Sequence, residues 1–296
     1  MFNKQMITYR LIRDYYSLTK PRVLILLLIT ALGGMVMASN GIPDMTIMLS
    51  VLLAGALAGG GAQAMNQSLD KKIDSAMLRT RGRPVASGRI SGLSAIVFGG
   101  VLNLLAFSIL VFLVNPLSAL VTVSGTAFYV LIYTIMLKKT TSQNIVIGGA
   151  AGAVPPVVGW VAVTGHFDLQ AAYLFAIIFF WTPPHFWALS LLIKDDYERA
   201  GVPMLPVVTS VGQTKWHILF YTVVLVSVTI LFVTTNAVGL VYLTMVLILG
   251  GMFLLFVFRL FHKPGIQGAK PLYLYSIVYL GLVFVAVAVD SVAKFG

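Results

Sequence analysis

The 296-residue chain has no cysteine and only nine acidic residues. The lack of cysteine excludes a disulfide scaffold, thiolate metal sites, Fe–S clusters and a cysteine nucleophile. Charged residues make up 10% of the chain, whereas an ordinary soluble domain carries about a quarter. So little charge excludes a cytosolic globular enzyme and a disordered tail.

Apolar sequence is what the chain has in abundance, since 59% of its residues are hydrophobic and its mean hydropathy is +0.95. A transmembrane helix needs about 20 apolar residues, and the uncharged stretches 90–137 and 216–258 are each long enough for two. Asn115-Pro116 and Thr234-Thr235-Asn236 mark turns near their middles. Dividing both stretches predicts nine spans, near residues 23–40, 46–64, 93–114, 117–137, 144–164, 170–192, 216–234, 237–257 and 272–290.

The chain is strongly basic, with 20 Lys and Arg and a net charge of +11. With the N-terminus in the cytoplasm, all of these basic residues except Lys294 fall in cytoplasmic segments, as the positive-inside rule requires. Membrane topology therefore explains the charge, and no nucleic-acid partner is expected. We predict an all-α polytopic membrane protein of nine helices around a central cavity, with a cytoplasmic N-terminus and a periplasmic C-terminus.

Residues 1–22, ahead of the first span, lack the apolar core of a signal peptide and the length of a transit peptide. The predicted location is a bacterial inner membrane, as a multi-pass protein in contact with lipid. Residues 1–296 are expected to form one domain, with 1–22 as a cytoplasmic segment in which Asp14 is a surface charge. Chemistry is expected in an intramembrane cavity and in the cytoplasmic loops 65–92 and 193–215.

The acidic residues that point to chemistry lie at the cytoplasmic ends of two spans. Asn66, Asp70 and Asp74 are spaced by four residues, which places them on one face of a helix. Like charges at this spacing oppose helix formation, so such a row favours a bound cation. Mg²⁺ commonly uses one or two carboxylates together with substrate phosphate oxygens. The alternative is a solvated helix face neutralised by Lys71 and Lys72.

Three arginines, Arg79, Arg81 and Arg83, follow this row within five residues. The planar guanidinium matches phosphate oxygens in two-pronged hydrogen bonds. A positive cluster beside a metal-binding row therefore favours a magnesium–diphosphate ligand. The alternative is that these arginines only hold the loop on the inner side of the membrane.

A second acidic group, Asp195, Asp196 and Glu198, follows the sixth span. Two acidic groups at equivalent ends of two spans can face each other across one cavity and share two metal ions. The acids expected to be solvated loop charges on the outer side are Asp44, Asp168 and Asp290.

These motifs resemble the UbiA family of intramembrane prenyltransferases, which have nine helices and two Asp-rich motifs. The first family motif, N-x-x-x-D-x-x-x-D, is matched in full by Asn66, Asp70 and Asp74. Within the family, the chain is similar to the branch that farnesylates haem, over residues 18 to about 215. The stretches that carry this resemblance are LTKPR (18–22), MLRTRGRP (77–84), YT (133–134), LKKT (137–140), NIVIGG (144–149), WTPPHFW (181–187) and KDDYERAGVPM (194–204).

The resemblance implies transfer of a farnesyl group from farnesyl diphosphate to a vinyl group of haem B, which gives haem O with its hydroxyethylfarnesyl chain. It implies Mg²⁺ as the cofactor, and a haem-modifying enzyme or terminal oxidase assembly as a candidate partner. Departure of the diphosphate leaves an allylic cation, which the vinyl π-electrons attack in an apolar cavity that excludes water.

The resemblance also implies roles for individual residues. The implied catalytic residues are Asn66, Asp70, Asp74, Asp195 and Asp196, of which all except Asp196 are implied metal ligands. The implied substrate-binding residues are Arg79, Arg83, Lys138, Lys139, Lys194, Tyr197 and His185. Many relatives carry a second D-x-x-x-D before a glycine. Aligned on Gly201, its two Asp positions fall on Ile193 and Tyr197, whereas this chain has the haem branch's K-D-D-Y.

Two other functions fit parts of the sequence. A sibling enzyme that prenylates an aromatic quinone precursor or chlorophyllide would share the first acidic row, but it should lack the aromatic stretch 181–187. A transporter would also show many spans and broken helices. It would need ionisable residues deep inside helices, and here nearly all acids sit at the cytoplasmic edge.

His185 lies inside the sixth predicted span, behind Trp181 and Pro183-Pro184. An ionisable residue within a membrane is a candidate functional residue, and here it would contact the haem iron or a propionate. The alternative is a packed histidine that bonds a carbonyl freed by the proline pair.

Overall fold

The structure is a computed structural model that describes residues 2–295, with side chains described for residues 9–293. In that part of the chain, nine helical segments are long and apolar enough to cross a membrane, which confirms the predicted number. The segments are α2 (Pro21–Ala38), α3 (Met45–Leu69), α5 (Gly92–Leu113), α6 with η1 (Pro116–Ala127 and Phe128–Leu137), α7 with α8 (Asn144–Gly152 and Val154–Thr164), α9 (Leu169–Leu192), α12 with η2 (Val211–Leu231 and Phe232–Thr235), α13 (Leu240–His262) and α14 (Ala269–Phe295).

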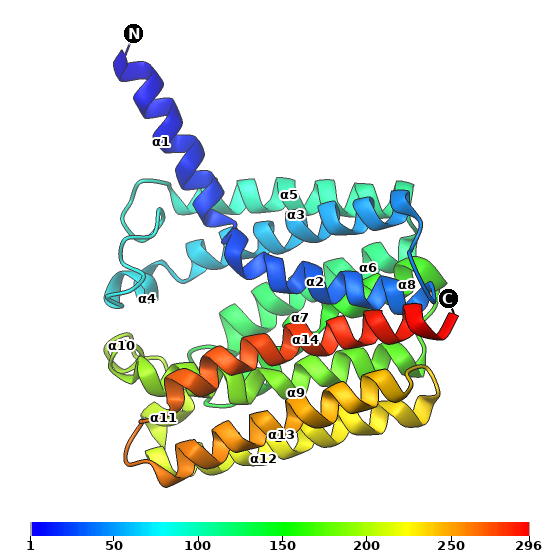
Figure 1. Ribbon diagram of the computed structural model, residues 1–296. Helices are drawn as coiled ribbons and strands as arrows, with labels where there is room; N and C mark the ends of the chain where they lie inside the picture. Colours follow the sequence, from blue (N-terminus) through cyan, green and yellow to red (C-terminus); the bar gives the residue numbers. More distant parts are fainter. Residues whose placement is uncertain (1, 296) are drawn as a thin grey trace.

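The short helices gather at one end of the bundle, on the left in Figure 1, which we call the basic end. They are α1 (Phe2–Leu18), α4 (Lys71–Ala76), α10 (Lys194–Arg199) and α11 (Leu205–Val208). The two chain termini emerge at opposite ends (Figure 1), as an odd number of spans requires. That the basic end faces the cytoplasm remains a prediction of the positive-inside rule.

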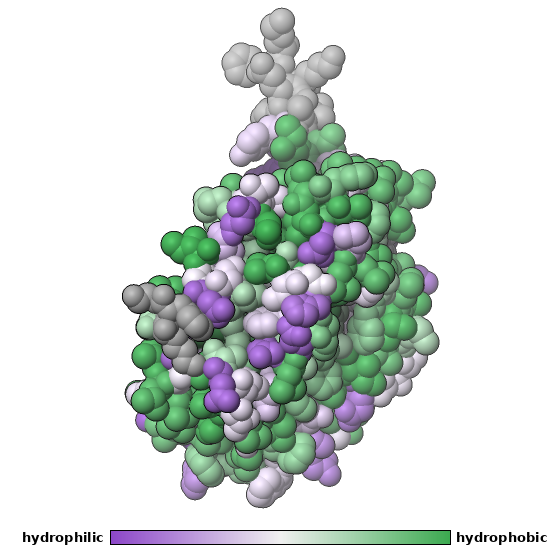
Figure 2. All heavy atoms as spheres, turned by 90° about the vertical axis from the view of Figure 1, so that its right-hand side faces the viewer, coloured by the Kyte–Doolittle hydropathy of each residue, from purple (hydrophilic) through white to green (hydrophobic). Residues whose placement is uncertain are grey.

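The outer surface of the bundle is apolar, as expected for a surface in contact with lipid. Figure 2 views the bundle along its helices, from the end opposite the basic end, and shows a mostly hydrophobic rim, with hydrophilic residues near the centre and at a few places along the lower edge. Large side chains within the spans, such as Phe112 and Leu120, are 82% and 61% exposed. In water such a surface would drive aggregation, whereas in a bilayer it is the expected lipid contact.

Two turns divide the long apolar stretches where the sequence predicted. Asn115 caps α6 by accepting a hydrogen bond from the Ser118 amide (2.8 Å), and its own amide donates to the Val161 carbonyl (2.9 Å). The turn between η2 and α13 is held by Asp290, which accepts from the amides of Gly239 (2.6 Å) and Tyr242 (3.1 Å). Asp290 is 1% exposed. The prediction of a solvated charge at Asp290 is therefore wrong, because the start of α13 needs an acceptor.

The other two outer acids also have structural partners. Asp44 is exposed and caps α3, because its side chain accepts from the amides of Thr46 and Ile47. Asp168 accepts from the Trp160 indole at 3.0 Å. Both lie at the end opposite the basic end, so neither bears on the acidic row of α3 and α4.

A close contact brings η1 and α7 together. A Cβ added to Gly148 on α7 would lie 2.3 Å from the ring of Tyr133 on η1. No side chain larger than hydrogen fits there, so Gly148 lets η1 and α7 pack closely, as small residues do in membranes. Pro155 lies in the first turn of α8, and Ala153 separates α8 from α7, so two helices make up the fifth span.

The π-helix η1 was not predicted. In this segment the Lys138 amide bonds the Tyr133 carbonyl at 2.9 Å, and the Thr134 hydroxyl bonds the Tyr129 carbonyl at 2.8 Å, both five residues back. π-helical turns are rare and concentrate at functional sites. Here the wider turn brings Tyr129, Tyr133, Thr134 and Lys138 beside the end of α3.

Candidate active site

The acidic row occupies the junction between α3 and α4. The Asp70 amide bonds the Asn66 carbonyl, and the Asp74 amide bonds the Asp70 carbonyl, each at 2.8 Å. The helical pattern thus continues across Asp70, where α3 ends and α4 begins. Asn66, Asp70 and Asp74 are 3%, 1% and 3% exposed. The alternative of a solvated face neutralised by Lys71 and Lys72 does not hold, because both lysines are exposed and the acids are buried.

Each carboxylate in the row has a basic partner from another part of the chain. Lys138, just after η1, forms an ion pair with one oxygen of Asp70. Arg83, in the loop after α4, donates to both oxygens of Asp74 at 2.8 and 2.9 Å. The Asn66 amide donates to Asp70 at 2.8 Å and to the Thr134 hydroxyl at 3.1 Å. The row, the loop and η1 therefore form one polar cluster.

One atom of this cluster is left without a partner. The second carboxylate oxygen of Asp70, Oδ1, is buried and has no hydrogen-bond partner among the described residues. A buried anionic oxygen without a donor is costly. A divalent cation held by carboxylates, an amide oxygen and phosphate would supply what this oxygen lacks. The residues present therefore fit a magnesium ion.

Lys20 and Gln63 belong to the same cluster, although neither was predicted as a site residue. Lys20, between α1 and α2, donates to the Gln63 side chain at 2.6 Å, and the Tyr129 hydroxyl donates to the same oxygen at 3.3 Å. Burial, together with the positive charges of Arg83 and Lys138, lowers the pKa of Lys20 to about 7. In the sequence, Lys20 is marked only by its place in the LTKPR stretch, and its partner Gln63 lies 43 residues further on.

The second acidic group does not join the row. Its Asp196 instead connects α10 to the loop that follows α4. Asp196 is 8% exposed, pairs with Arg199, and accepts from the Leu78 amide at 3.3 Å. Burial raises the pKa of Asp196, but hydrogen bonds from Arg199 and from the backbone amides of Leu78 and Arg79 outweigh it and lower the pKa overall. Asp196 therefore ties α10 to the loop that carries the arginines.

Tyr197 lies next to this tie. Its hydroxyl accepts from Arg79 at 3.3 Å, and the Arg79 guanidinium lies 5.7 Å from its ring centre. Burial raises the pKa of Tyr197, so the phenol stays protonated at neutral pH. Arg79 and Tyr197 thus form a second contact between the two loops.

The remaining predicted residues stand further from the row. Asp195 and Lys139 are exposed, and Lys194 is partly exposed. Among the described residues, no three His, Asp or Glu side chains gather closely enough to hold a metal ion. The structure therefore brings together Asn66, Asp70 and Asp74, and it leaves Asp195 outside that group.

An apolar cluster lies between the row and the last two turns of α9. Tyr133 and Phe186 pack there against buried residues of both loops and of the start of α7, namely Ile73, Met77, Ile145, Tyr197, Val202 and Met204. Stacked aromatic rings continue the surface, since Tyr129 and Tyr133 lie 5.5 Å apart. An apolar chain that starts at the row would therefore follow aromatic side chains into the bundle.

His185 immediately precedes Phe186 in α9, and its side chain contacts α14. Its Nδ1 lies 2.7 Å from the Ser276 hydroxyl, which donates to the Tyr273 carbonyl at 2.6 Å. The Trp181 ring stacks on the imidazole at 4.2 Å, and its indole donates to the Ser276 carbonyl at 2.7 Å. The imidazole is packed in the bundle, as the alternative expected, but its hydrogen-bond partner is a hydroxyl on α14 instead of a carbonyl freed by Pro183-Pro184.

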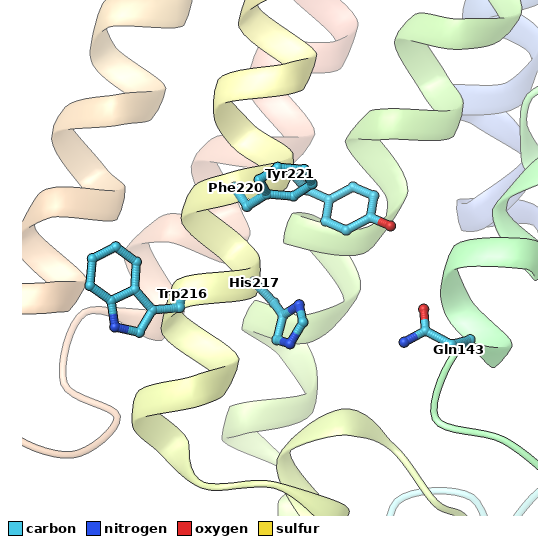
Figure 3. A pocket seen from close by; sticks show the side chains of 5 residues that line it. All are labelled: Gln143, Trp216, His217, Phe220 and Tyr221. Carbon is cyan, nitrogen blue, oxygen red and sulfur yellow. The ribbon is translucent and has the colours of Figure 1, made fainter.

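A separate groove lies away from the acidic row, between α12 and the start of α7 (Figure 3). It measures about 430 Å³ and is lined by Gln143, Trp216, His217, Phe220 and Tyr221. The rings of His217 and Tyr221 each make an edge-to-face contact with the buried Trp187 ring of α9, at centroid distances of 5.6 and 5.4 Å. Neither the row nor its basic partners Lys138 and Arg83 line this groove.

Comparisons with known sequences agree on one family. The sequence profile of the UbiA prenyltransferase family matches residues 27–278. A protoheme IX farnesyltransferase from Gloeothece citriformis (strain PCC 7424) is 50% identical over 284 residues, which cover 95% of this chain and 88% of that protein. The protoheme IX farnesyltransferase of Gloeobacter violaceus (strain ATCC 29082 / PCC 7421) is 47% identical over 96% of this chain and 93% of its own length.

Solved structures share the fold at much lower identity. A digeranylgeranylglyceryl phosphate synthase gives a TM-score of 0.79 at 20% identity, over 95% of this chain and 99% of that one. A UbiA homologue from Archaeoglobus fulgidus, bound to GPP and Mg²⁺, gives a TM-score of 0.63 at 12% identity, over 93% and 99% of the two chains. These matches establish a common arrangement of helices.

Proposed function

The chain belongs to the UbiA prenyltransferase family, and from this premise we propose that it transfers a farnesyl group from farnesyl diphosphate to a vinyl group of haem B, which produces haem O. The observation that carries the proposal is the buried row of Asn66, Asp70 and Asp74 facing Lys138 and Arg83. The named activity of relatives at 47–50% identity supports haem B as the acceptor.

The row would hold Mg²⁺ through Asp70 and Asp74, with Asn66 beside them. When bound, the ion would neutralise charge on the departing diphosphate. Asp70 Oδ1 is the oxygen most ready for this role, because it is buried and has no partner among the described residues. Asp195 would serve a second ion only after a change in the 194–204 loop, since it is exposed as it stands.

Substrate binding would exchange partners within the cluster. Without substrate, Lys138 neutralises Asp70 and Arg83 neutralises Asp74. Once both carboxylates bind a divalent metal ion, Lys138 and Arg83 would be free to bind the phosphate oxygens. Their positive charge and N–H donors match these oxygens. Lys20 lies close enough to interact electrostatically with Arg83 and Lys138, and it would add a third positive charge. The cluster therefore keeps its charges paired in both states.

The aromatic residues beside the cluster would protect the reactive intermediate. The C1–O bond of farnesyl diphosphate breaks, and the electron pair leaves with the diphosphate. The stacked Tyr129 and Tyr133 rings present π-faces to the allylic cation that remains, an interaction that favours cations when water is excluded. The vinyl π-electrons then form the new C–C bond, and water adds to the second cation with loss of a proton.

His185 would bind the acceptor through the haem iron. The single proton of the Ser276 hydroxyl goes to the Tyr273 carbonyl, so the proton shared between His185 and Ser276 sits on Nδ1. Nε2 then carries a lone pair, because the hydrogen bond of His185 to a described residue is made by Nδ1. A neutral imidazole whose other nitrogen donates a hydrogen bond is the usual form of a metal-binding histidine.

The test is incubation of membranes containing the chain with haem B, farnesyl diphosphate and Mg²⁺, followed by extraction and mass measurement of the haem. The haem should gain the mass of one farnesyl group and one hydroxyl group, because the vinyl group becomes the hydroxyethylfarnesyl chain. An unchanged haem mass, with prenylation of a supplied aromatic quinone precursor instead, would contradict haem as the acceptor.

The iron contact needs a separate readout. His185→Ala should shift the visible absorption of haem bound to the purified chain. The matched control is His217→Ala, in the separate groove between α12 and the start of α7. The same spectrum in wild type and His185→Ala would rule out the iron contact.

A further inference from the structure

Helix α1 lies outside the bundle and leaves its basic end at a steep angle to the spans (Figure 1). Three contacts fix its rotation about its own axis. Leu18 is fully buried, the Tyr15 ring meets the Phe98 ring edge-on at 4.9 Å, and Asp14 accepts from Arg89 at 2.9 Å. The faces of α1 therefore point in defined directions.

These contacts also identify which side of α1 faces the bilayer. Arg89 belongs to the loop outside the spans, whereas Phe98 lies within the membrane-crossing segment Gly92–Leu113. The Asp14 side of α1 is thus the water side, and the Tyr15 side is at membrane depth.

The exposed residues of α1 divide in the same way. Successive residues turn by about 100° around a helix, so Tyr9, Ile12 and Tyr16 follow Tyr15 on the side away from Asp14. They are 69%, 65% and 63% exposed. Arg10 and Ser17 lie on the Asp14 side, and Arg13 lies between Ser17 and Tyr9 at the border of the apolar stripe. All three are exposed. One helix thus has an apolar stripe on its membrane side, with arginines on its water side and at the border of the stripe.

We propose that α1 is an interfacial helix whose stripe of Tyr9, Ile12 and Tyr16 is seated in the leaflet at the basic end. Tyrosine rings favour the headgroup level, and an apolar stripe beside arginines is the pattern of helices that lie in the membrane surface. Arg10 and Arg13 would lie at anionic lipid phosphates. A lipid leaflet therefore covers the stripe, rather than a protein partner.

This arrangement fixes the start of the active site, a consequence that rests on the proposed function. The chain passes from α1 to α2 at Lys20, which has a left-handed backbone conformation (φ 49°). The Leu18 carbonyl accepts from the Gln67 side chain at 3.0 Å, next to Asn66 of the row. Seating α1 in lipid would hold Lys20 where it meets Gln63.

The test uses the absence of cysteine in the chain, because any introduced cysteine is then labelled uniquely. Ile12→Cys and Tyr16→Cys are compared with Ser17→Cys on the water side of the same helix, each carrying a nitroxide in full-length chain in nanodiscs. Phe112→Cys calibrates lipid exposure, and Gln267→Cys in the α13–α14 loop calibrates water exposure. The accessibility of each label to oxygen and to a water-soluble nickel chelate is measured.

We expect labels at Ile12 and Tyr16 to match Phe112, with an oxygen-to-nickel ratio several-fold higher than at Ser17, which should match Gln267. Water-like values at all α1 positions would overturn the proposal. Shielding of Ile12 and Tyr16 from both reagents, in nanodiscs holding one copy, would also overturn it, since protein would then cover the stripe. The readout does not depend on haem O, so its failure is distinct from failure of the proposed function.

Discussion

Lys138 and Asp70 form an ion pair that joins the end of η1 to the end of α3, and it engages one oxygen of the carboxylate while leaving the other buried and unpartnered within the described part of the chain. The pair is almost fully enclosed, because the side chains are 15% and 1% exposed. A half-satisfied buried carboxylate is unfavourable unless a ligand completes it.

Replacing Asp70 should abolish turnover without unfolding the chain. Asp70→Asn keeps the shape but removes the charge that would hold the metal, and removal of one such electrostatic group typically costs roughly 100-fold or more in rate. Haem O formation is measured in membranes of equal protein content. Asp44→Asn is the matched control, since it makes the same change at the other end of α3, where asparagine still caps the helix. Turnover within a few-fold of wild type for Asp70→Asn would refute the assignment.

Breaking the Lys138–Asp70 pair should cost stability that a second change restores. Lys138→Met leaves an uncompensated buried carboxylate, and loss of one partner in buried pairs costs about 3–5 kcal/mol. The double variant Lys138→Met/Asp70→Asn removes both charges and should melt at a higher temperature than Lys138→Met alone. Thermal unfolding in one detergent measures this. Strictly additive losses would show that the two residues are not coupled.

Lys20 predicts how donor binding depends on pH. Its pKa is lowered to about 7 in the free chain, and a bound diphosphate raises it, so the complex holds more protons than the free chain above about pH 7. Affinity for farnesyl diphosphate should therefore fall as pH rises from 7 to 9. Lys20→Arg, which stays charged, should bind without this fall, whereas Lys20→Gln should bind weakly at every pH.

Binding measured at several pH values compares the three chains. The titration of the diphosphate itself is common to all of them and cancels in the comparison. A decline of equal slope in wild type and Lys20→Arg would show that Lys20 does not contact the diphosphate.

The hydroxyl of Ser276 should set the haem affinity through His185. Ser276→Ala removes the group that fixes the proton on Nδ1, and loss of such a supporting hydrogen bond typically weakens metal binding by roughly tenfold or more. Haem B binding should weaken while farnesyl diphosphate binding is unchanged. Ser291→Ala is the control on the same helix, because that hydroxyl bonds only the Val287 carbonyl. Equal haem affinities in the two variants would separate Ser276 from the acceptor site.

The sequence predicted the features that depend on local pattern. The length of uncharged stretches gave nine spans, and Asn115-Pro116 marked a turn that the structure confirms. The four-residue spacing of Asn66, Asp70 and Asp74 marked a shared face, because helix periodicity alone decides which neighbours meet. These inferences needed no contact between distant segments.

The features that escaped prediction depend on contacts across the fold. The π-helix η1 leaves no periodic signal, since its apolar residues suit an α-helix equally. Asp290 reads as a loop charge until the start of α13 is placed beside it, 51 residues earlier. Ser276 gains its role only because α14 packs against α9, which lies 91 residues away at His185. Lys20 likewise depends on a left-handed backbone turn.

The most direct test of the account is magnesium-dependent binding of an unreactive farnesyl diphosphate analogue to the purified chain. We predict that wild type binds the analogue only when Mg²⁺ is present, and that Asp70→Asn and Asp74→Asn each lose this dependence together with the affinity. Tight binding by wild type without any divalent ion, or unchanged magnesium-dependent binding by either variant, would contradict the account.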